Sequence, residues 1–248
     1  MNPVLLVTGG SRGIGAATAL LAARQGWAVA VNYTQNAAAA DAIVQQIKSG
    51  GGQAVSIQAD VGDEAQIKHL FAQVDAQLGR LTGFVNNAGV LDVAVRVDEL
   101  SWERAERIMR INVVGAMICA REAVLRMSTK HGGKGGAIVN LSSAAAKLGS
   151  PGMYVDYAAA KGAIDTFTLG LAREVAAEGI RVNAVCPGWI DTPLLAPMDP
   201  MMRAGIVMGI PRGRLGTADE IAELVRFLAG PESSYCNGDV FAASGGFV

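Results

Sequence analysis

Charged residues are scarce in this sequence, and neither sign is in excess. They make up 17% of the 248 residues, against about 25% in an average soluble domain. The 21 basic and 22 acidic side chains leave a net charge of −1, so the basic stripe of a nucleic-acid-binding protein is missing. No apolar run reaches the roughly 18 residues that a membrane span requires, and the first residues lack the basic segment of a secretory signal. We therefore expect neither nucleic-acid nor membrane partners.

Histidine and cysteine are also few. The two histidines, His69 and His131, stand in no spacing typical of a metal site, so no bound metal is expected. The three cysteines, Cys119, Cys186 and Cys236, are odd in number and far apart. This favours reduced thiols and a cytoplasmic location over a disulfide framework.

Apolar residues and glycine are abundant, at 51% of the chain and 31 positions respectively. Short apolar runs alternate with longer helical patterns, which is typical of an α/β fold whose parallel sheet carries helices on both faces. The expected strands are 4–8, 28–33, 54–58, 84–86, 137–141, 182–186 and 239–243. The expected helices are 13–25, 37–48, 64–78, 102–128, 155–178 and 219–229. Because no linker or repeat interrupts the pattern, we predict one domain over residues 1–248.

Two connecting segments are longer than the others. The glycine- and lysine-rich segment 129–136 is interpreted as a solvated turn. The segment 188–216 is rich in methionine and proline and follows a strand end, which favours a substrate lid. The alternative is that its methionines fill gaps between helices.

The first predicted strand runs directly into a glycine-rich turn and a helix. Gly9, Gly13 and Gly15 would let the backbone turn tightly and let a diphosphate approach the amides at the helix start. The alternative is that these glycines only permit the helix to pack on the strand.

A second cluster lies on the predicted helix 155–178. Tyr157 and Lys161 are four residues apart, so both side chains lie on one helix face. An ammonium group beside the phenol is expected to lower the pKa of Tyr157 toward working pH. Tyr157 could then donate a proton to a carbonyl or accept one from an alcohol, and Ser143 could hydrogen-bond the same oxygen. The alternative is an exposed ion-pair-like contact without a catalytic role.

These segments resemble the motifs of the short-chain dehydrogenase/reductase family. The turn Thr8-Gly-Gly-Ser-Arg-Gly-Ile-Gly15 has that family's glycine spacing. In order after it come Asn86-Asn-Ala-Gly89, Asn112, Ser142-Ser143, Tyr157-Ala-Ala-Ala-Lys161, and Pro187-Gly188 with Thr192. The resemblance covers essentially the whole chain. Within the family, the chain most resembles 3-oxoacyl-carrier-protein reductases and glucose 1-dehydrogenase-like members. It implies a single Rossmann-type doubly wound domain with a seven-stranded parallel sheet, assembled as a homotetramer or dimer.

The resemblance also implies roles for individual residues. Asn112, Ser143, Tyr157 and Lys161 would be catalytic, with Asn112 supporting a proton-relaying water and Lys161 also binding the nicotinamide ribose. The implied cofactor contacts are Gly9, Ser11, Arg12, Gly13, Ile14, Gly15, Asn32, Tyr33, Thr34, Asp60, Val61, Asn87, Ala88, Gly89, Tyr157, Lys161, Pro187, Gly188, Ile190 and Thr192. Two features depart from the family. Ser143 stands one residue further from Tyr157 than is common, and segment 129–136 replaces a short turn, which puts carrier-protein docking in doubt.

The choice of nicotinamide depends on residues 32–36. An NAD site usually has a carboxylate there for the ribose 2′-hydroxyl, and no Asp or Glu occurs before Asp41. The Arg12 guanidinium could instead bind a 2′-phosphate, and a basic residue at this place goes with NADP in the family. NADP(H) is therefore expected, with NAD(H) as the second choice.

The leading hypothesis is an NADP(H)-dependent oxidoreductase that interconverts a small-molecule carbonyl and an alcohol. A non-catalytic dinucleotide-binding regulator and an NAD-dependent sugar or alcohol dehydrogenase are the alternatives. The low charge fraction and the apolar helices 102–128 and 155–178 favour a homotetramer.

Overall fold

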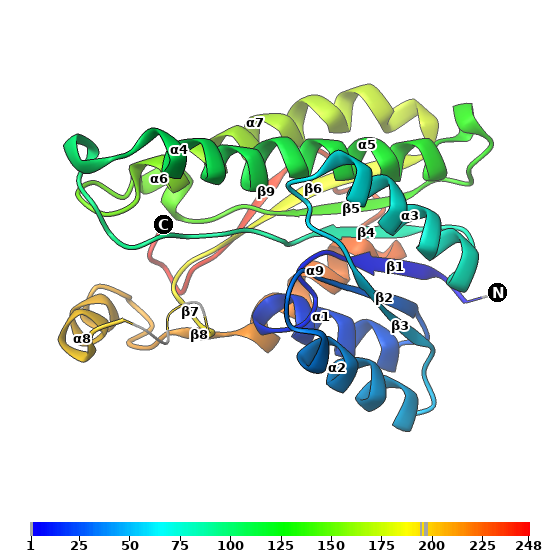
Figure 1. Cartoon of the computed structure of the whole chain (residues 1–248), viewed down its shortest axis with the longest axis horizontal. Coiled ribbons are helices and arrows are strands. Elements are labelled where there is room, and N and C mark those ends of the chain that lie inside the picture. The colour runs from blue at the N-terminus through cyan, green and yellow to red at the C-terminus, as the bar shows by residue number, and fades with distance from the viewer. Residues whose placement is uncertain (1, 194, 196–197) are drawn as a thin grey trace.

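The fold is built on one sheet of seven parallel strands (Figure 1). The computed structural model describes residues 2–193, 195 and 198–248. The strands stand in the order β3-β2-β1-β4-β5-β6-β9. Their bounds are β1 Val4–Val7, β2 Ala28–Tyr33, β3 Ala54–Gln58, β4 Gly83–Asn86, β5 Gly136–Leu141, β6 Ile180–Pro187 and β9 Val240–Ala243. All seven predicted strands are present, with ends within two residues of the expected ones.

The strands lack polar alternation because helices cover both faces of the sheet. On one face lie α1 (Gly13–Arg24), α2 (Ala37–Ser49) and α9 (Ala218–Ala229); on the other lie α3 (Glu64–Leu78), α5 (Ala116–Met127) and α7 (Val155–Val175). In β1, Leu5 and Val7 pack into the hydrophobic core beneath α1, α2 and α9, whereas Leu6 packs into the core beneath α3, α5 and α7. Alternate residues of one strand thus serve two hydrophobic cores.

The predicted helix 102–128 is present over 102–127, but its middle is π-helical. It consists of α4 (Trp102–Met109), a π-helical segment η2 (Arg110–Gly115) and then α5. Gly115 is required at this point, because a Cβ there would lie 2.1 Å from the Val61 carbonyl oxygen. The π segment contains Asn112, and segments of this kind occur frequently at functional sites. The predicted helix 155–178 similarly ends as α7 at Val175, followed by the short 3₁₀ turn Ala176–Glu178.

The segment predicted as a lid contains regular structure. Strand β7 (Ile190–Asp191) pairs with β8 (Gly216–Thr217), and helix α8 (Pro200–Met208) lies between them. The carboxylate of Asp199 caps α8 by accepting the Met201 and Met202 amides. Residues 194 and 196–197 of the predicted lid lie outside the described residues. In Figure 1, α8 projects from the sheet beyond the β7–β8 pair.

The segment 129–136 forms a 3₁₀ turn (Thr129–His131) and a glycine-rich return to β5. Most of it is exposed, as expected for a solvated turn. None of the helices in the described part of the chain has both the length and the apolar character that crossing a membrane requires.

Candidate active site

A cavity of about 1000 Å³ lies where the strands β1 to β6 end and their connecting loops begin. This edge of a doubly wound sheet is where ligands bind, because the loops after neighbouring parallel strands converge there. The cavity is lined by most of the residues predicted from the sequence. Three of them, Gly15, Asn32 and Asn112, are not among its lining residues.

The glycine turn after β1 forms one wall of the cavity. Gly9 and Gly13 have φ values of +61° and +55°, which disfavour other residues there. Both line the cavity, as do Ser11, Arg12 and Ile14. This backbone cradle at the start of α1 fits a diphosphate. Gly15 instead lies buried inside the fold, close to the glycine turn. A Cβ at this position would lie 2.4 Å from the Gly9 carbonyl oxygen, so the close approach requires glycine.

Asn32 supports the glycine turn from behind. Its side chain is buried; Oδ1 accepts the Gly9 amide at 3.2 Å, and Nδ2 donates to the Ala59 carbonyl at 3.0 Å. The expectation that Asn32 contacts the cofactor is therefore corrected, since its amide is already used to join β1, β2 and β3. Tyr33 and Thr34, the next residues, do line the cavity.

Polar, uncharged residues line the cavity with Arg12, and Asp60 is the acidic residue of the cavity lining. Arg12, Tyr33, Thr34, Gln35 and Asn36 line the cavity together. Among the described residues, no hydrogen bond or ion pair engages the Arg12 side chain. Asp60 and Val61 line the adjoining wall, where the Asp60 carboxylate accepts the Gly62 amide at 2.7 Å.

The loop after β4 is tied to the glycine turn. The Asn87 amide nitrogen donates to the carbonyls of Thr8 and Gly9 at 2.8 and 3.1 Å. The Thr8 hydroxyl accepts the backbone amides of Asn87 and Ala88 at 3.0 and 3.1 Å. Thr8 was not singled out as a site residue, although it opens the quoted motif. Together these bonds hold the first two loops of the cavity at a set separation.

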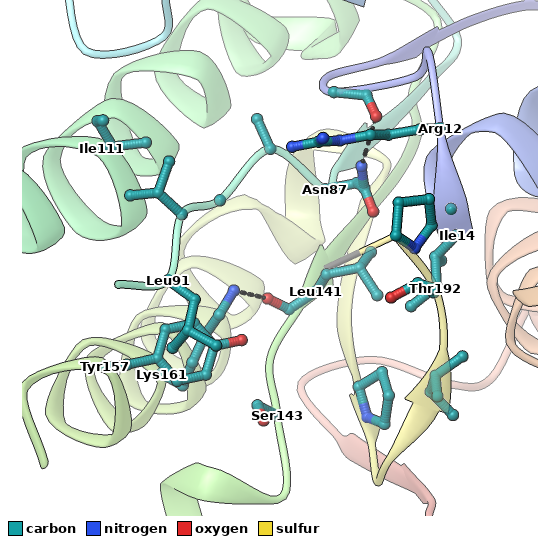
Figure 2. A pocket seen from close by; sticks show the side chains of 18 of the residues that line it. Arg12, Ile14, Asn87, Leu91, Ile111, Leu141, Ser143, Tyr157, Lys161 and Thr192 are labelled. Atoms are coloured by element: carbon teal, nitrogen blue, oxygen red, sulfur yellow. Dashed lines mark hydrogen bonds between the residues drawn. The ribbon is translucent and has the colours of Figure 1, made fainter. Parts of the chain in front are cut away.

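Tyr157, Lys161 and Ser143 come together at the other end of the cavity (Figure 2). The Lys161 Nζ lies 5.6 Å from the centre of the Tyr157 ring and donates to the Leu141 carbonyl at 2.5 Å. Burial lowers the pKa of Lys161 to about 8, although the Asp165 carboxylate acts in the opposite direction. Tyr157 and Lys161 lie on one helix, α7, as their spacing predicted, and Ser143 lies in the loop after β5.

The expected lowering of the Tyr157 pKa is not found. Burial raises the pKa of Tyr157 to about 12, and the nearby Ser143 hydroxyl offsets this only in part. The expectation fails because burial of the phenol itself dominates, and the Lys161 ammonium is directed at the Leu141 carbonyl. The protein's own groups therefore keep the phenol protonated near neutral pH, in the form that can donate a proton.

Asn112 lies behind the cavity wall. Its Oδ1 accepts the Val90 amide and its Nδ2 donates to the Val90 carbonyl, both at 2.8 Å. The π segment turns Asn112 inward so that one amide group satisfies both backbone groups of a loop residue. Asn112 thus positions Gly89 and Val90, which line the cavity. The water relay that the family resemblance implies for it stays a prediction.

Part of the remaining cavity lining is apolar and was not predicted from the sequence. It comes from the loop after β5, from the predicted lid and from the C-terminal residues: Leu148, Tyr154, Trp189, Leu195 and Phe247. No periodicity joins such scattered positions. The short helix α6 (Ala145–Leu148) and a turn with positive φ at Gly149, Ser150 and Gly152 accommodate the extra residue between Ser143 and Tyr157.

On the opposite wall Pro187, Gly188, Ile190 and Thr192 line the cavity, as predicted. The cavity lies at the strand ends of a parallel sheet, with a glycine cradle at one end of the cavity and a Ser-Tyr-Lys cluster at the other. This combination defines a dinucleotide-dependent oxidoreductase of Rossmann type. A family model described as "Enoyl-(Acyl carrier protein) reductase" matches residues 9–248. The chain belongs to the short-chain dehydrogenase/reductase family.

Known relatives extend along almost the entire chain. The "Uncharacterized oxidoreductase YgfF" of Escherichia coli (strain K12) is 50% identical over 98% of this chain and 99% of its own. A 3-oxoacyl-[acyl-carrier-protein] reductase of Synechocystis is 38% identical over 99% of this chain and 96% of its own. Among solved structures, a blue fluorescent protein from a metagenomic library, in complex with NADPH, is similar with a TM-score of 0.91. It is 37% identical and the match covers 99% of this chain and 98% of that one.

Proposed function

We propose that the chain is an NADP(H)-dependent reductase of a small-molecule carbonyl, reversible as an alcohol dehydrogenase. The observation that carries the proposal is the convergence of Tyr157, Ser143 and Lys161 on the same cavity as the glycine cradle of Gly9 and Gly13. A regulator that only binds a dinucleotide would not need a proton donor there. NADPH would supply the hydride when bound.

The chain's own residues would perform the proton transfer. The Tyr157 phenol, kept protonated by burial, would donate to the carbonyl oxygen as the hydride arrives. The Ser143 hydroxyl would orient that oxygen. Lys161, on the same face of α7, would bind the nicotinamide ribose through its ammonium group. The protonated resting state of Tyr157 supports the reductive direction at neutral pH.

The proposed preference for NADP over NAD depends on Arg12. Its guanidinium lines the cavity beside residues 33–36, and no carboxylate lies within that stretch. A 2′-phosphate could accept a bidentate pair from the guanidinium. The NADPH bound to the similar metagenomic protein supports this choice of cofactor.

The apolar lining near Tyr157 supports an uncharged substrate end. Leu148, Trp189, Leu195 and Phe247 would contact a carbon skeleton, whereas Ser143 and Tyr157 would contact the carbonyl oxygen. A cytoplasmic location fits the three free cysteines, of which Cys119 and Cys186 are buried. A homotetramer is proposed as the assembly.

A panel of ketones and aldehydes, assayed by the loss of NADPH absorbance, tests the function. Tyr157→Phe keeps the ring and removes the proton donor, so kcat should fall by about 10² to 10⁴. Fluorescence titration should show NADPH still bound to the variant within a few-fold of the wild-type Kd. Wild-type turnover in Tyr157→Phe would refute the role of Tyr157, and failure of the wild type to reduce any carbonyl would refute the proposed function.

A further inference from the structure

One ion pair is distinguished by its burial and by its position beside the proposed proton donor. Arg104 of α4 reaches Asp156 in the first turn of α7: Nε lies 2.7 Å from Oδ2, and Nη2 lies 3.2 Å from Oδ1. The two side chains are only 9% and 4% exposed. No other ion pair among the described residues has both side chains below a tenth exposed. This bidentate geometry fixes the orientation as well as the separation of the two groups.

Asp156 is the residue immediately before Tyr157. Burial raises the pKa of Asp156, but the hydrogen-bonded Arg104 guanidinium and the neighbouring backbone amides outweigh it and hold the pKa below its usual value. The carboxylate is therefore ionised, and its residue is joined by a peptide bond to the residue that carries the phenol. A displacement of Asp156 would be passed to Tyr157 through the peptide bond between them.

Arg104 also holds the loop that follows β4. Its Nη1 donates to the Val93 carbonyl. Two residues later, the Val95 amide donates to the Met153 carbonyl at 3.0 Å, which joins the same loop to the segment entering α7. One guanidinium thus binds both the start of α7 and the loop that faces it.

A second arginine of α4 acts on the same loop. Arg107 pairs with Asp92, whose carboxylate also accepts the Val93 amide at 2.8 Å. The preceding residues, Val90 and Leu91, line the cavity that Tyr157 also lines. Helix α4 is therefore linked both to the loop that places Val90 and Leu91 in the cavity wall and to the residue before Tyr157, the proposed proton donor.

We propose that Arg104 and Asp156 are positioning residues that hold Tyr157 at its working distance from a carbonyl seated against Val90 and Leu91. The proposal rests on the proposed reductase function. Buried ion pairs seldom stabilise a fold more than apolar residues of the same size would, so stability alone does not account for a pair at this place. Orientation does, because a displacement of about 1 Å at a reacting group can lower a rate about a hundredfold.

The test compares Arg104→Gln and Asp156→Asn with a matched control, Arg126→Gln. Arg126 is a part-buried arginine that pairs with Asp75 at 2.7 Å and Glu122 at 2.9 Å, between α3 and α5. It does not line the cavity. Steady-state kinetics with the best carbonyl of the panel, NADPH titration and thermal unfolding are measured for each variant.

Loss of the Arg104–Asp156 pair should lower kcat about tenfold to a hundredfold, with the Kd of NADPH within about twofold of wild type. The double variant should be no slower than the slower single variant, because both changes remove one interaction. Arg104→Lys should recover part of kcat. Arg126→Gln should leave kcat unchanged even where it lowers Tm.

A wild-type kcat in Arg104→Gln, or a kcat loss in Arg126→Gln equal to that in Arg104→Gln, would overturn the proposal. Asp156→Asn is nearly isosteric and keeps a test available if Arg104→Gln does not fold. If the wild type itself reduces no carbonyl, the reductase function fails. Amide hydrogen exchange then tests separately whether the Arg104–Asp156 pair holds the start of α7 and the loop after β4 in place. Exchange in peptides covering 90–96 and 152–160 should be faster in Asp156→Asn than in wild type; unchanged exchange would overturn the proposal.

Discussion

Lys161 is subject to two opposing demands. Its ammonium is suited to binding a ribose and to assisting Tyr157, but Lys161 is only 5% exposed. Burial accordingly lowers its pKa from 10.5 to about 8. The position thus stores free energy unfavourable to folding at the place where chemistry is expected, as functional sites commonly do.

The lowered pKa predicts how stability should vary with pH. Between pH 8 and 10.5 the unfolded chain binds more protons at Lys161 than the folded chain does, so stability should rise with pH across this window. Lys161→Met should remove that contribution. The free energy of unfolding of the wild type relative to Lys161→Met should increase by roughly 1 kcal/mol per pH unit. Urea unfolding from pH 8 to 10 measures it, and a constant difference would contradict the lowered pKa.

Arg12 should determine which nicotinamide binds. NADPH should bind at least about tenfold, or ~1.4 kcal/mol, better than NADH. Arg12→Ala should reduce this preference mainly by weakening NADPH, and adding Tyr33→Asp should reverse it, because a carboxylate accepts the 2′-hydroxyl and repels a phosphate. Arg24→Ala, an exposed arginine near the other end of α1, is the control. Equal affinities of the wild type for both cofactors, by fluorescence titration, would favour the NAD alternative.

Motif spacing located the residues that point into the cavity and failed for those that support it. Tyr157 and Lys161 were predictable because a separation of four fixes a common helix face. The bonds of Asn32 and Asn112 were not, because they depend on carbonyls of β3 and of the loop after β4, far away in the chain. The direction of the Tyr157 pKa shift was also predicted wrongly, because it depends on burial, and the spacing of residues in the sequence does not report burial.

At the scale of elements, helices followed their apolar periodicity until a tertiary contact intervened. The pattern predicted one helix over 102–128, but the backbone widens to a π turn at Arg110–Gly115. The close approach of Gly115 to Val61 joins this turn to the loop after β3. Helix α8 was missed because its surroundings are rich in proline, although Pro200 stands at its first turn, where proline is tolerated.

Gly115→Ala tests the importance of that contact. The new Cβ would lie 2.1 Å from the Val61 carbonyl oxygen, so the π segment or the loop after β3 must move. We expect a loss of stability of about 1–3 kcal/mol, the range for overpacking, together with a lower kcat because Asn112 moves. The control is Gly205→Ala in α8, where nothing lies within 4 Å; it should be neutral or slightly stabilising. Equal Tm values for Gly115→Ala and wild type would contradict the expectation.

At the scale of the whole molecule, the layers were predictable and the shape of the cavity was not. Alternating strands and helices predict a doubly wound sheet whose strand ends form a ligand site. The apolar half of that site is assembled from Leu148, Trp189 and Phe247, which come from three loops without a shared pattern. Such positions depend on how the loops pack, and only the folded chain brings them together.

The outer face of α4, α5 and α7 determines the last prediction, which concerns assembly. Helices α4 and α5 follow one another along one helical run, joined by η2, and α7 lies beside this run over one face of the sheet (Figure 1). Large apolar side chains on α4, η2, α5 and α7 are exposed: Trp102 at 80%, Val114 at 53%, Leu125 at 44% and Leu169 at 41%. Large apolar side chains exposed on one layer of helices are typical of an interface.

Sedimentation at micromolar concentration should therefore give a tetramer of the 25.6 kDa chain, with a dimer as the smaller alternative. The double variant Leu125→Glu/Leu169→Glu should sediment as a smaller species, because each buried copy of the face would carry unpaired carboxylates, which are costly to desolvate. Met201→Glu places the same charge on an exposed apolar residue of α8, outside this face, and should leave the mass unchanged. A wild-type monomer would refute the assembly, and a tetramer that survives both leucine substitutions would place the interface elsewhere.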